Sequence, residues 1–98
     1  MIEDIKLTGI SEETINKMME ELGYDIVLSM ACNYKKIKEN IELFKSINII
    51  NIEELLLNKN EIFFKETSLL KEKIFRFDIP SLVEIINDDF EVIDEVLK

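Results

Sequence analysis

Hydrophobic residues recur at helical spacing along almost the whole chain. The clearest case is Tyr34, Ile37, Ile41 and Phe44, whose steps of three, four and three residues form one stripe. This spacing predicts a helix over residues 34–46, with a charged, solvated surface on its opposite face.

A second helix is predicted over residues 11–22. Ser11 is a suitable N-cap, and Glu12 and Glu13 follow in the first turn, where the helix dipole favours acidic side chains. Gly23 is well placed to end this helix, because glycine readily adopts the left-handed conformation of a helix C-terminus.

Two further segments have less regular patterns, and both are predicted to lead into helices. Residues 47–52 are rich in isoleucine, but no other segment offers them a partner strand, and Asn51 is typical of a helix start. Pro80 suits the first turn of another helix, which is apolar on nearly all sides in its middle. We therefore expect the helix that begins near Pro80 to lie in the centre of the fold.

The last helix is expected over residues 89–97. Asp94 and Glu95 would lie in its last turn, where the helix dipole disfavours acidic side chains. Neutralising both is therefore expected to stabilise the isolated fold modestly.

Three junctions between apolar segments resemble one another. Each pairs a residue that enters the left-handed region cheaply with an isoleucine that would fill the space between two helices, and they are Gly9-Ile10, Asn48-Ile49 and Asp78-Ile79. Offsets of 39 and 30 residues between them lie in the range of helical repeat units. The sequence thus predicts an all-α fold with about three imperfect helix-hairpin repeats, stacked into one domain over residues 1–98.

The stretches over residues 41–63 and 7–13 carry a family resemblance. The first combines an apolar helix, a short turn ending in isoleucine and a second helix that begins with acidic residues, and the second contains the same turn and the acidic start of the helix after it. Both resemble the repeat of the mitochondrial transcription termination factor family. The resemblance implies a fold of stacked helix hairpins. It also departs from the family, because Asn60 and Asp89 replace a proline and the family's strongly basic concave surface is missing. The resemblance therefore supports the family's fold and not its binding of nucleic acid.

Charge is high and unevenly distributed. The net charge is −9, made up of −5 over residues 1–33, +1 over residues 34–75 and −5 over residues 76–98. Such a chain repels phosphate backbones and anionic membranes. We expect it to bind a protein partner that presents a basic surface. The predicted partner-binding residues form a C-terminal acidic pole of Asp88, Asp89, Glu91, Asp94 and Glu95 and an N-terminal acidic pole of Glu12, Glu13, Glu20 and Glu21. Alternatively, this acidity serves solubility alone.

Catalysis is hard to build from these residues. The chain has no histidine and a single cysteine, Cys32, which excludes imidazole bases, Cys-His nucleophiles and the usual zinc sites. Neither glycine belongs to a phosphate-binding loop. We expect no enzymatic activity, no cofactor and no metal, and we expect Cys32 to be a buried, inert thiol.

The sequence also predicts where the protein is located, and it leaves two other functions open. A single cysteine, no signal peptide and no long apolar run predict a cytoplasmic protein without a membrane span. One alternative function is a phage-type inhibitor that imitates the charge of nucleic acid. The other is nucleic-acid binding, as the family resemblance implies, and it requires that Lys35, Lys36, Lys38, Lys71, Lys73 and Arg76 line one groove. The aromatic residues Phe63, Phe64, Phe75 and Phe77 lie near basic residues, but their spacing is more typical of a core.

Overall fold

The computed structural model describes residues 1–98 and contains helices and turns but no strand. The chain forms three short 3₁₀ helices (η) and seven α-helices. Their order is η1 (Ile2–Thr8), α1 (Glu12–Glu21), α2 (Tyr24–Cys32), α3 (Tyr34–Ser46), α4 (Ile52–Asn58), η2 (Asn60–Phe64), α5 (Thr67–Ile74), α6 (Ile79–Asp88), η3 (Phe90–Val92) and α7 (Ile93–Val96). The all-α prediction is confirmed, and the isoleucine-rich segment at residues 47–52 is indeed the approach to a helix.

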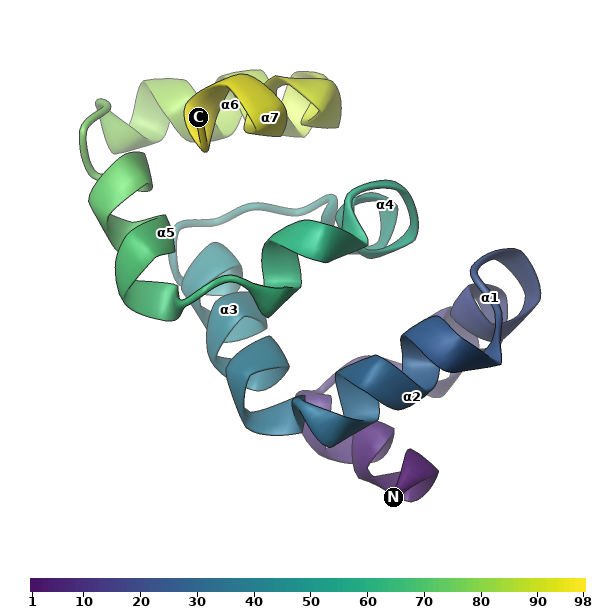
Figure 1. Cartoon of the computed structure of the whole chain (residues 1–98). Helices are drawn as coiled ribbons and strands as arrows, with labels where there is room; N and C mark the ends of the chain where they lie inside the picture. Colours follow the sequence, from purple (N-terminus) through teal and green to yellow (C-terminus); the bar gives the residue numbers. More distant parts are fainter.

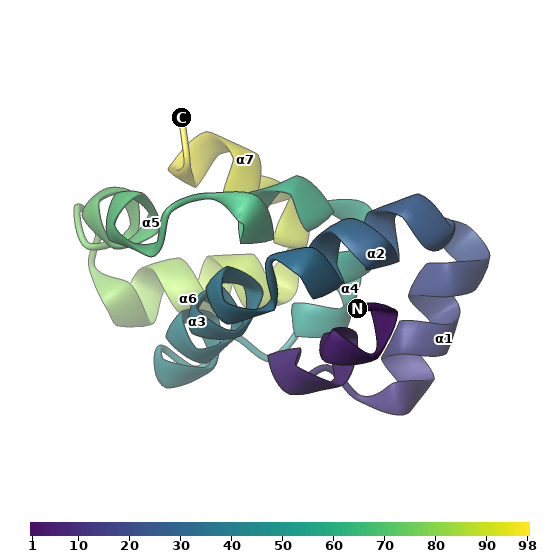
Figure 2. The same cartoon turned by 60° about the horizontal axis from the view of Figure 1, so that its bottom comes forward.

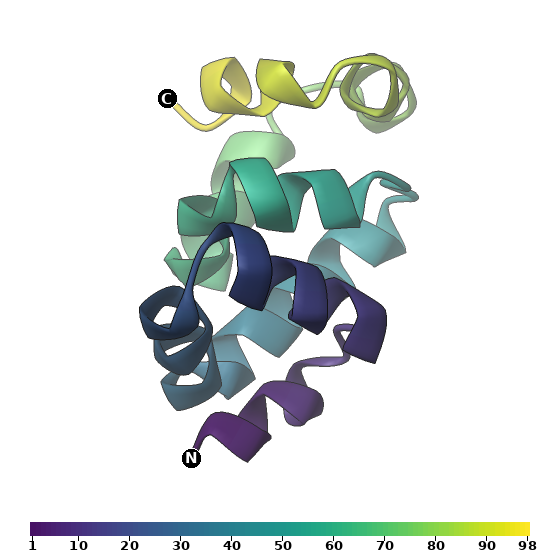
Figure 3. The ribbon, with the colours of Figure 1, turned by 90° about the vertical axis from the view of Figure 1, so that its right-hand side faces the viewer.

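The helices are arranged along one axis of an elongated molecule of 38 × 24 × 21 Å. The two termini lie at opposite ends, and the chain advances from one to the other (Figures 1 and 3). At the N-terminal end η1 lies against α2, as Figure 2 shows, and it also packs on α3. Helix α3 is central, because it contacts η1, α2, α4, η2 and α5.

The core is a single cluster that runs through this arrangement. The predicted stripe of α3 provides Ile37, Ile41 and Phe44, which are at most 3% exposed. Phe44 meets Phe63 of η2 edge to face, with ring centroids 5.4 Å apart. This geometry is favourable for aromatic pairs, and it fixes η2 against the centre of α3.

The turn after α3 has the conformation that the sequence predicts. Asn48 has a positive φ of 72°. Its N–H donates to the Lys45 carbonyl, and the Ile49 N–H donates to the Phe44 carbonyl, so that both carbonyls at the helix end are satisfied. Ile49 then turns inward and is buried. Gly9 and Gly23 also have positive φ, as their positions predict.

The third junction differs from this prediction. Asp78 has a φ of −69°, and its carboxylate accepts hydrogen bonds from the backbone N–H and the hydroxyl of Ser81. It therefore caps the N-terminus of α6 and does not close the C-terminus of α5. The prediction of a left-handed turn at Asp78 was wrong, because an aspartate just before Ile79 and Pro80 satisfies the first free N–H groups of a helix.

Asn48 offers a direct test of the left-handed turn. Replacing Asn48 by glycine is expected to leave stability unchanged or slightly higher, because glycine has no Cβ to strain at this φ. Replacement by valine is expected to cost about 1–2 kcal/mol, since a branched Cβ clashes in this region. Urea unfolding of both variants makes the comparison, and equal stabilities would contradict the assigned turn.

Helix α6 does not lie in the centre, contrary to the prediction from its apolar composition. It lies at the C-terminal end of the molecule, where η3 packs against it (Figure 1). Leu82, Val83 and Ile86 are buried, but Ile85 is 50% exposed. One face of α6 is therefore covered and the other is open.

Other predictions about burial are partly corrected. Phe63 is buried and Phe64 is half-buried, but Phe75 and Phe77 are about half exposed because they lie in the turn after α5 has ended. Cys32 is exposed. It is the last residue of α2, whose buried face is made by other residues, so its thiol is not part of the core.

The C-terminal segment forms two short helices in place of the predicted continuous one, η3 and α7. Ile93 and Val96 are buried, while Phe90, Val92 and Leu97 pack partly against the core. The segment is thus helical as predicted, but in two elements.

Candidate functional site

The N-terminal acidic pole lies on the exposed surface of α1. Glu12, Glu13, Glu20 and Glu21 are all exposed, and none of them makes an ion pair. The hydroxyl of Ser11 caps this helix by accepting from the Thr14 N–H, as predicted. The helix therefore holds four uncompensated carboxylates on a rigid element.

The only basic residue of α1 is engaged by a different carboxylate. Lys17 Nζ lies 2.7 Å from Glu53 Oε1 of α4. The hydrogen bond from Lys17 lowers the pKa of Glu53, and the same bond raises the pKa of Lys17. This pair joins α1 to α4, and the nearby charges of Glu13 and Glu21 in the N-terminal acidic pole add to the rise in the pKa of Lys17.

The Lys17–Glu53 pair predicts a pH dependence of stability. Because the pKa of Glu53 is lowered on folding, its contribution is present above the pKa of an unfolded glutamate and is lost as the pH falls through the folded value. Because the pKa of Lys17 is raised, that contribution is full below the pKa of an unfolded lysine and is lost as the pH rises through the folded value. Glu53→Gln should thus be less stable than wild type between about pH 5 and pH 10, and the difference should shrink on either side.

Urea unfolding across pH checks this expectation. The neighbouring substitution Glu54→Gln is the matched control, because Glu54 is on the same helix and has no ion pair. A pH-independent difference between wild type and Glu53→Gln would contradict the assigned pair.

The C-terminal acidic pole is partly neutralised within the molecule. Lys59 Nζ lies 2.6 Å from Asp94 Oδ2 and 3.4 Å from Glu91 Oε2, and the Lys59 side chain is only 15% exposed. The hydrogen bond to Asp94 raises the pKa of Lys59. Glu95 pairs with Lys98, and Asp89 caps η3 by accepting from the Glu91 N–H. Of this predicted pole, only Asp88 has neither an ion pair nor a capping hydrogen bond.

Asp94 therefore has a structural partner that the sequence pattern does not reveal. The expectation that neutralising Asp94 stabilises the fold placed Asp94 and Glu95 in the last turn of one longer helix. That placement was wrong, because both lie in the first turn of the four-residue α7, and the Lys59 pair also opposes the expected gain. Lys59 and Asp94 are 35 residues apart, so helical spacing carries no signal of their contact.

The two acidic poles occupy different parts of the fold. Helix α1 packs on α4, whereas α6, η3 and α7 form the C-terminal end (Figures 1 and 3). The structure does not bring the predicted partner-binding residues together into one site.

The basic residues of α3 and α5 are interleaved with acidic ones. Lys36 pairs with Glu66, Lys38 approaches Glu42 at 4.0 Å, and Arg76 pairs with Glu72. These contacts neutralise half of the set that nucleic-acid binding would require. Lys71 shares a surface depression with two acidic residues, and the full lining is Glu39, Glu42, Leu43, Ser46, Thr67 and Lys71.

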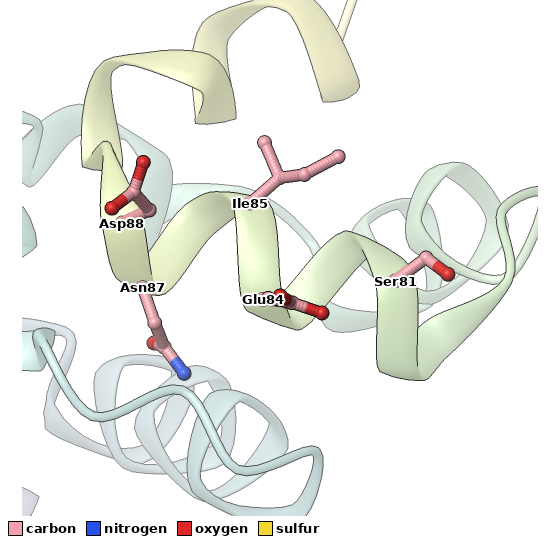
Figure 4. A pocket seen from close by; sticks show the side chains of 5 residues that line it. All are labelled: Ser81, Glu84, Ile85, Asn87 and Asp88. Atoms are coloured by element: carbon pink, nitrogen blue, oxygen red, sulfur yellow. The ribbon is translucent and has the colours of Figure 1, made fainter.

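A depression of about 720 Å³ lies on the open face of α6. It is lined by Ser81, Glu84, Ile85, Asn87 and Asp88 (Figure 4). Asn87 points to the turn after α3, where its Oδ1 accepts from the Ile50 N–H and its Nδ2 donates to the Asn48 carbonyl. Ile85 points to the opposite side of the helix (Figure 4).

Sequence reasoning did not identify Glu84 and Ile85 as surface-site residues. Their positions three and four residues after Ser81 give a detectable signal once the buried face of α6 is known. Composition alone does not reveal the exposure of Ile85, because the neighbouring apolar residues of α6 are buried.

The described chain contains no group of three or more His, Cys, Asp or Glu residues placed to hold a metal ion. Its helices are also too short or too polar to cross a membrane.

Comparisons with protein-family models, with curated proteins and with solved structures find no match.

Proposed function

We propose that this chain is a non-catalytic helical-repeat module that binds a protein partner through a basic surface of that partner. The observation that carries the proposal is the set of four glutamates on α1, which have no ion pair although six of the chain's cations are paired elsewhere. Uncompensated charge on one rigid helix steers and orients a partner of opposite charge.

The stacked helix hairpins support the scaffold part of the proposal. The order helix, turn, helix and 3₁₀ helix occurs in α3, α4 and η2, and again in α5, α6 and η3. This order agrees with the repeat of the mitochondrial transcription termination factor family, so we extend the proposal to a fold of that kind. Repeats of this sort present extended surfaces for partners.

Chemistry supports the non-catalytic part of the proposal. The chain lacks histidine, and its adjacent carboxylates on helices diverge by about 100°, so that they do not converge on one substrate bond. A cytoplasmic location belongs to the proposal as well, because a single cysteine leaves no internal disulfide for an oxidising compartment to form.

Binding of a basic partner is tested by removing the charge of α1. In the first variant Glu12, Glu13, Glu20 and Glu21 become glutamine. In a matched control Glu42, Glu66, Glu72 and Glu95 become glutamine, which changes the net charge equally at exposed residues that already have cationic neighbours. Immobilised wild type and both variants are incubated with native cell lysate at low and high salt, with and without nuclease.

We expect wild type to capture a basic protein whether or not nuclease is present. The α1 variant should lose this capture at low salt, and the control should retain most of it, because screening and global charge are the same for both. Equal capture by all three proteins would leave solubility as the explanation of the acidity. Loss of capture after nuclease treatment would favour nucleic-acid binding instead.

A further inference from the structure

Helix α6 is the second helix of the last hairpin. The second helices are α1, α4 and α6, of which α1 packs against α4, and the turn before α4 is bonded to α6 through Asn87. In stacked repeats each unit contacts its neighbours. On its outward side α6 presents exposed residues to solvent.

Apart from Pro80, the exposed residues of α6 form a single stripe. Ser81, Glu84, Ile85 and Asp88 are all exposed, and the last three follow Ser81 by three, four and seven residues, which places them on one side of the helix. We call this stripe the α6 outer face. It provides four of the five residues that line the 720 Å³ depression, and Ile85 stands within it 50% exposed.

The charge of the α6 outer face is uniformly acidic. Glu84 and Asp88 have no ion pair, and α6 contains neither lysine nor arginine. An apolar side chain flanked by two unpaired carboxylates is complementary to an amphipathic helix that carries basic residues on either side of an apolar one.

We propose that the α6 outer face docks a basic amphipathic helix of the protein partner. One apolar side chain of that helix packs on Ile85, and its lysine or arginine side chains contact Glu84 and Asp88. This inference rests on the proposed function and adds to the acidic surface of α1 a second contact, which takes a helical segment of the same partner.

A second copy of the chain is a poorer occupant of this face. Two α6 outer faces packed symmetrically would bring the carboxylates of Glu84 and Asp88 near those of the other copy, and each copy has a net charge of −9. Charge complementarity therefore selects a basic helix over self-association.

The test uses designed peptides as probes. The first is a labelled helical peptide of leucine and lysine with leucines at three- and four-residue spacing. The second has glutamate in place of lysine, and the third is a scrambled lysine peptide that cannot form an amphipathic helix. Fluorescence anisotropy measures their affinities for the full chain, and backbone amide shifts locate the bound probe.

Two variants alter the α6 outer face, and one is a control. Glu84→Lys/Asp88→Lys reverses its charge, and Ile85→Ser removes its apolar contact. Glu54→Lys/Glu61→Lys makes the same charge change at exposed residues of α4 and η2 that have no ion pair and no proposed role in binding. Circular dichroism establishes that each variant is folded, which is expected because all these side chains are exposed.

We expect the basic amphipathic peptide to bind wild type and to shift the amides of α6. The charge reversal and Ile85→Ser should each weaken this binding about tenfold or more, and the Glu54→Lys/Glu61→Lys control should stay within about twofold of wild type. The glutamate peptide and the scrambled peptide should bind far more weakly.

Other outcomes overturn the inference in distinguishable ways. Unchanged binding in both α6 variants would remove α6 as the surface and leave the proposed function, which the capture from lysate tests separately, standing. Equal binding of the glutamate peptide would contradict both. Concentration-dependent dimers that disappear in Ile85→Ser would show that a second copy occupies the face.

Discussion

Replacing Asn40 by alanine is expected to lower the free energy of unfolding by about 2–4 kcal/mol, because three hydrogen bonds between elements are lost. The Asn40 side chain is completely buried in α3. Its Nδ2 donates to the carbonyls of Phe63 and Lys65, each at 2.8 Å, and its Oδ1 accepts from the Thr67 hydroxyl at 2.6 Å. This single amide therefore ties α3 to both ends of the segment between η2 and α5.

The matched control is Asn58→Ala. Asn58 is exposed, and its Nδ2 donates only to the Glu54 carbonyl one turn earlier in the same helix. Its loss is expected to change stability by no more than about 0.5 kcal/mol. Urea unfolding of both variants makes the comparison, and similar small losses would show that the three bonds of Asn40 contribute little.

A double-mutant cycle with Thr67 tests whether the interaction is specific. Thr67→Val removes the hydroxyl that donates to Asn40, and it should destabilise the fold by about 1 kcal/mol. The double variant should lose less than the sum of the two single losses, since both remove the same hydrogen bond. Strict additivity would contradict a direct Asn40–Thr67 interaction.

Asn40 also shows how far local sequence patterns reach. It lies three residues after Ile37 and four before Phe44, on the buried stripe of α3, so spacing alone indicates that its amide must find partners. Those partners are 23 to 27 residues away along the chain. Spacing therefore predicts the need for hydrogen bonds and contains no information about the groups that provide them.

The same limit explains which predictions of the fold succeeded. The Ser11 cap, the positive φ of Asn48 and the helix of residues 34–46 depend on neighbours within about five residues, and the sequence predicts them well. The place of α6 at the end of the molecule depends on how whole hairpins stack. An apolar composition indicates burial, but it does not distinguish a central helix from a terminal one with an open face.

The candidate surfaces follow this division. The exposed glutamates of α1 are predictable because they are charged residues at the two ends of a helix whose buried residues are Thr14 and Met18. The pairing of Lys59 with Glu91 and Asp94 is not predictable, because η3 and α7 reach Lys59 only through the stacking of the last hairpin on the one before. For this reason the C-terminal acidic pole is less available to a partner than its composition indicates.

Replacing Phe63 by alanine is expected to have the largest effect of all, a loss of about 3–5 kcal/mol of unfolding free energy. Phe63 is completely buried, and its ring meets that of Phe44 at 74°, so the substitution removes a large side chain and an aromatic contact at the centre of the core. A domain of this size has only about 5–10 kcal/mol in total, so the variant should lose a large part of its stability and unfold at a much lower temperature than wild type.

A milder change keeps this expectation measurable if the alanine variant does not fold. Phe63→Leu retains most of the apolar volume and should cost roughly 1–2 kcal/mol, which urea unfolding resolves. The control is Phe75→Ala, because Phe75 is 54% exposed and touches the solvent after α5 has ended. Its stability should stay within about 0.5 kcal/mol of wild type. A loss of unfolding free energy at Phe75 as large as that at Phe63 would mean that the turn between α5 and α6 is packed against the core. That result would contradict the exposure of Phe75 in the structure.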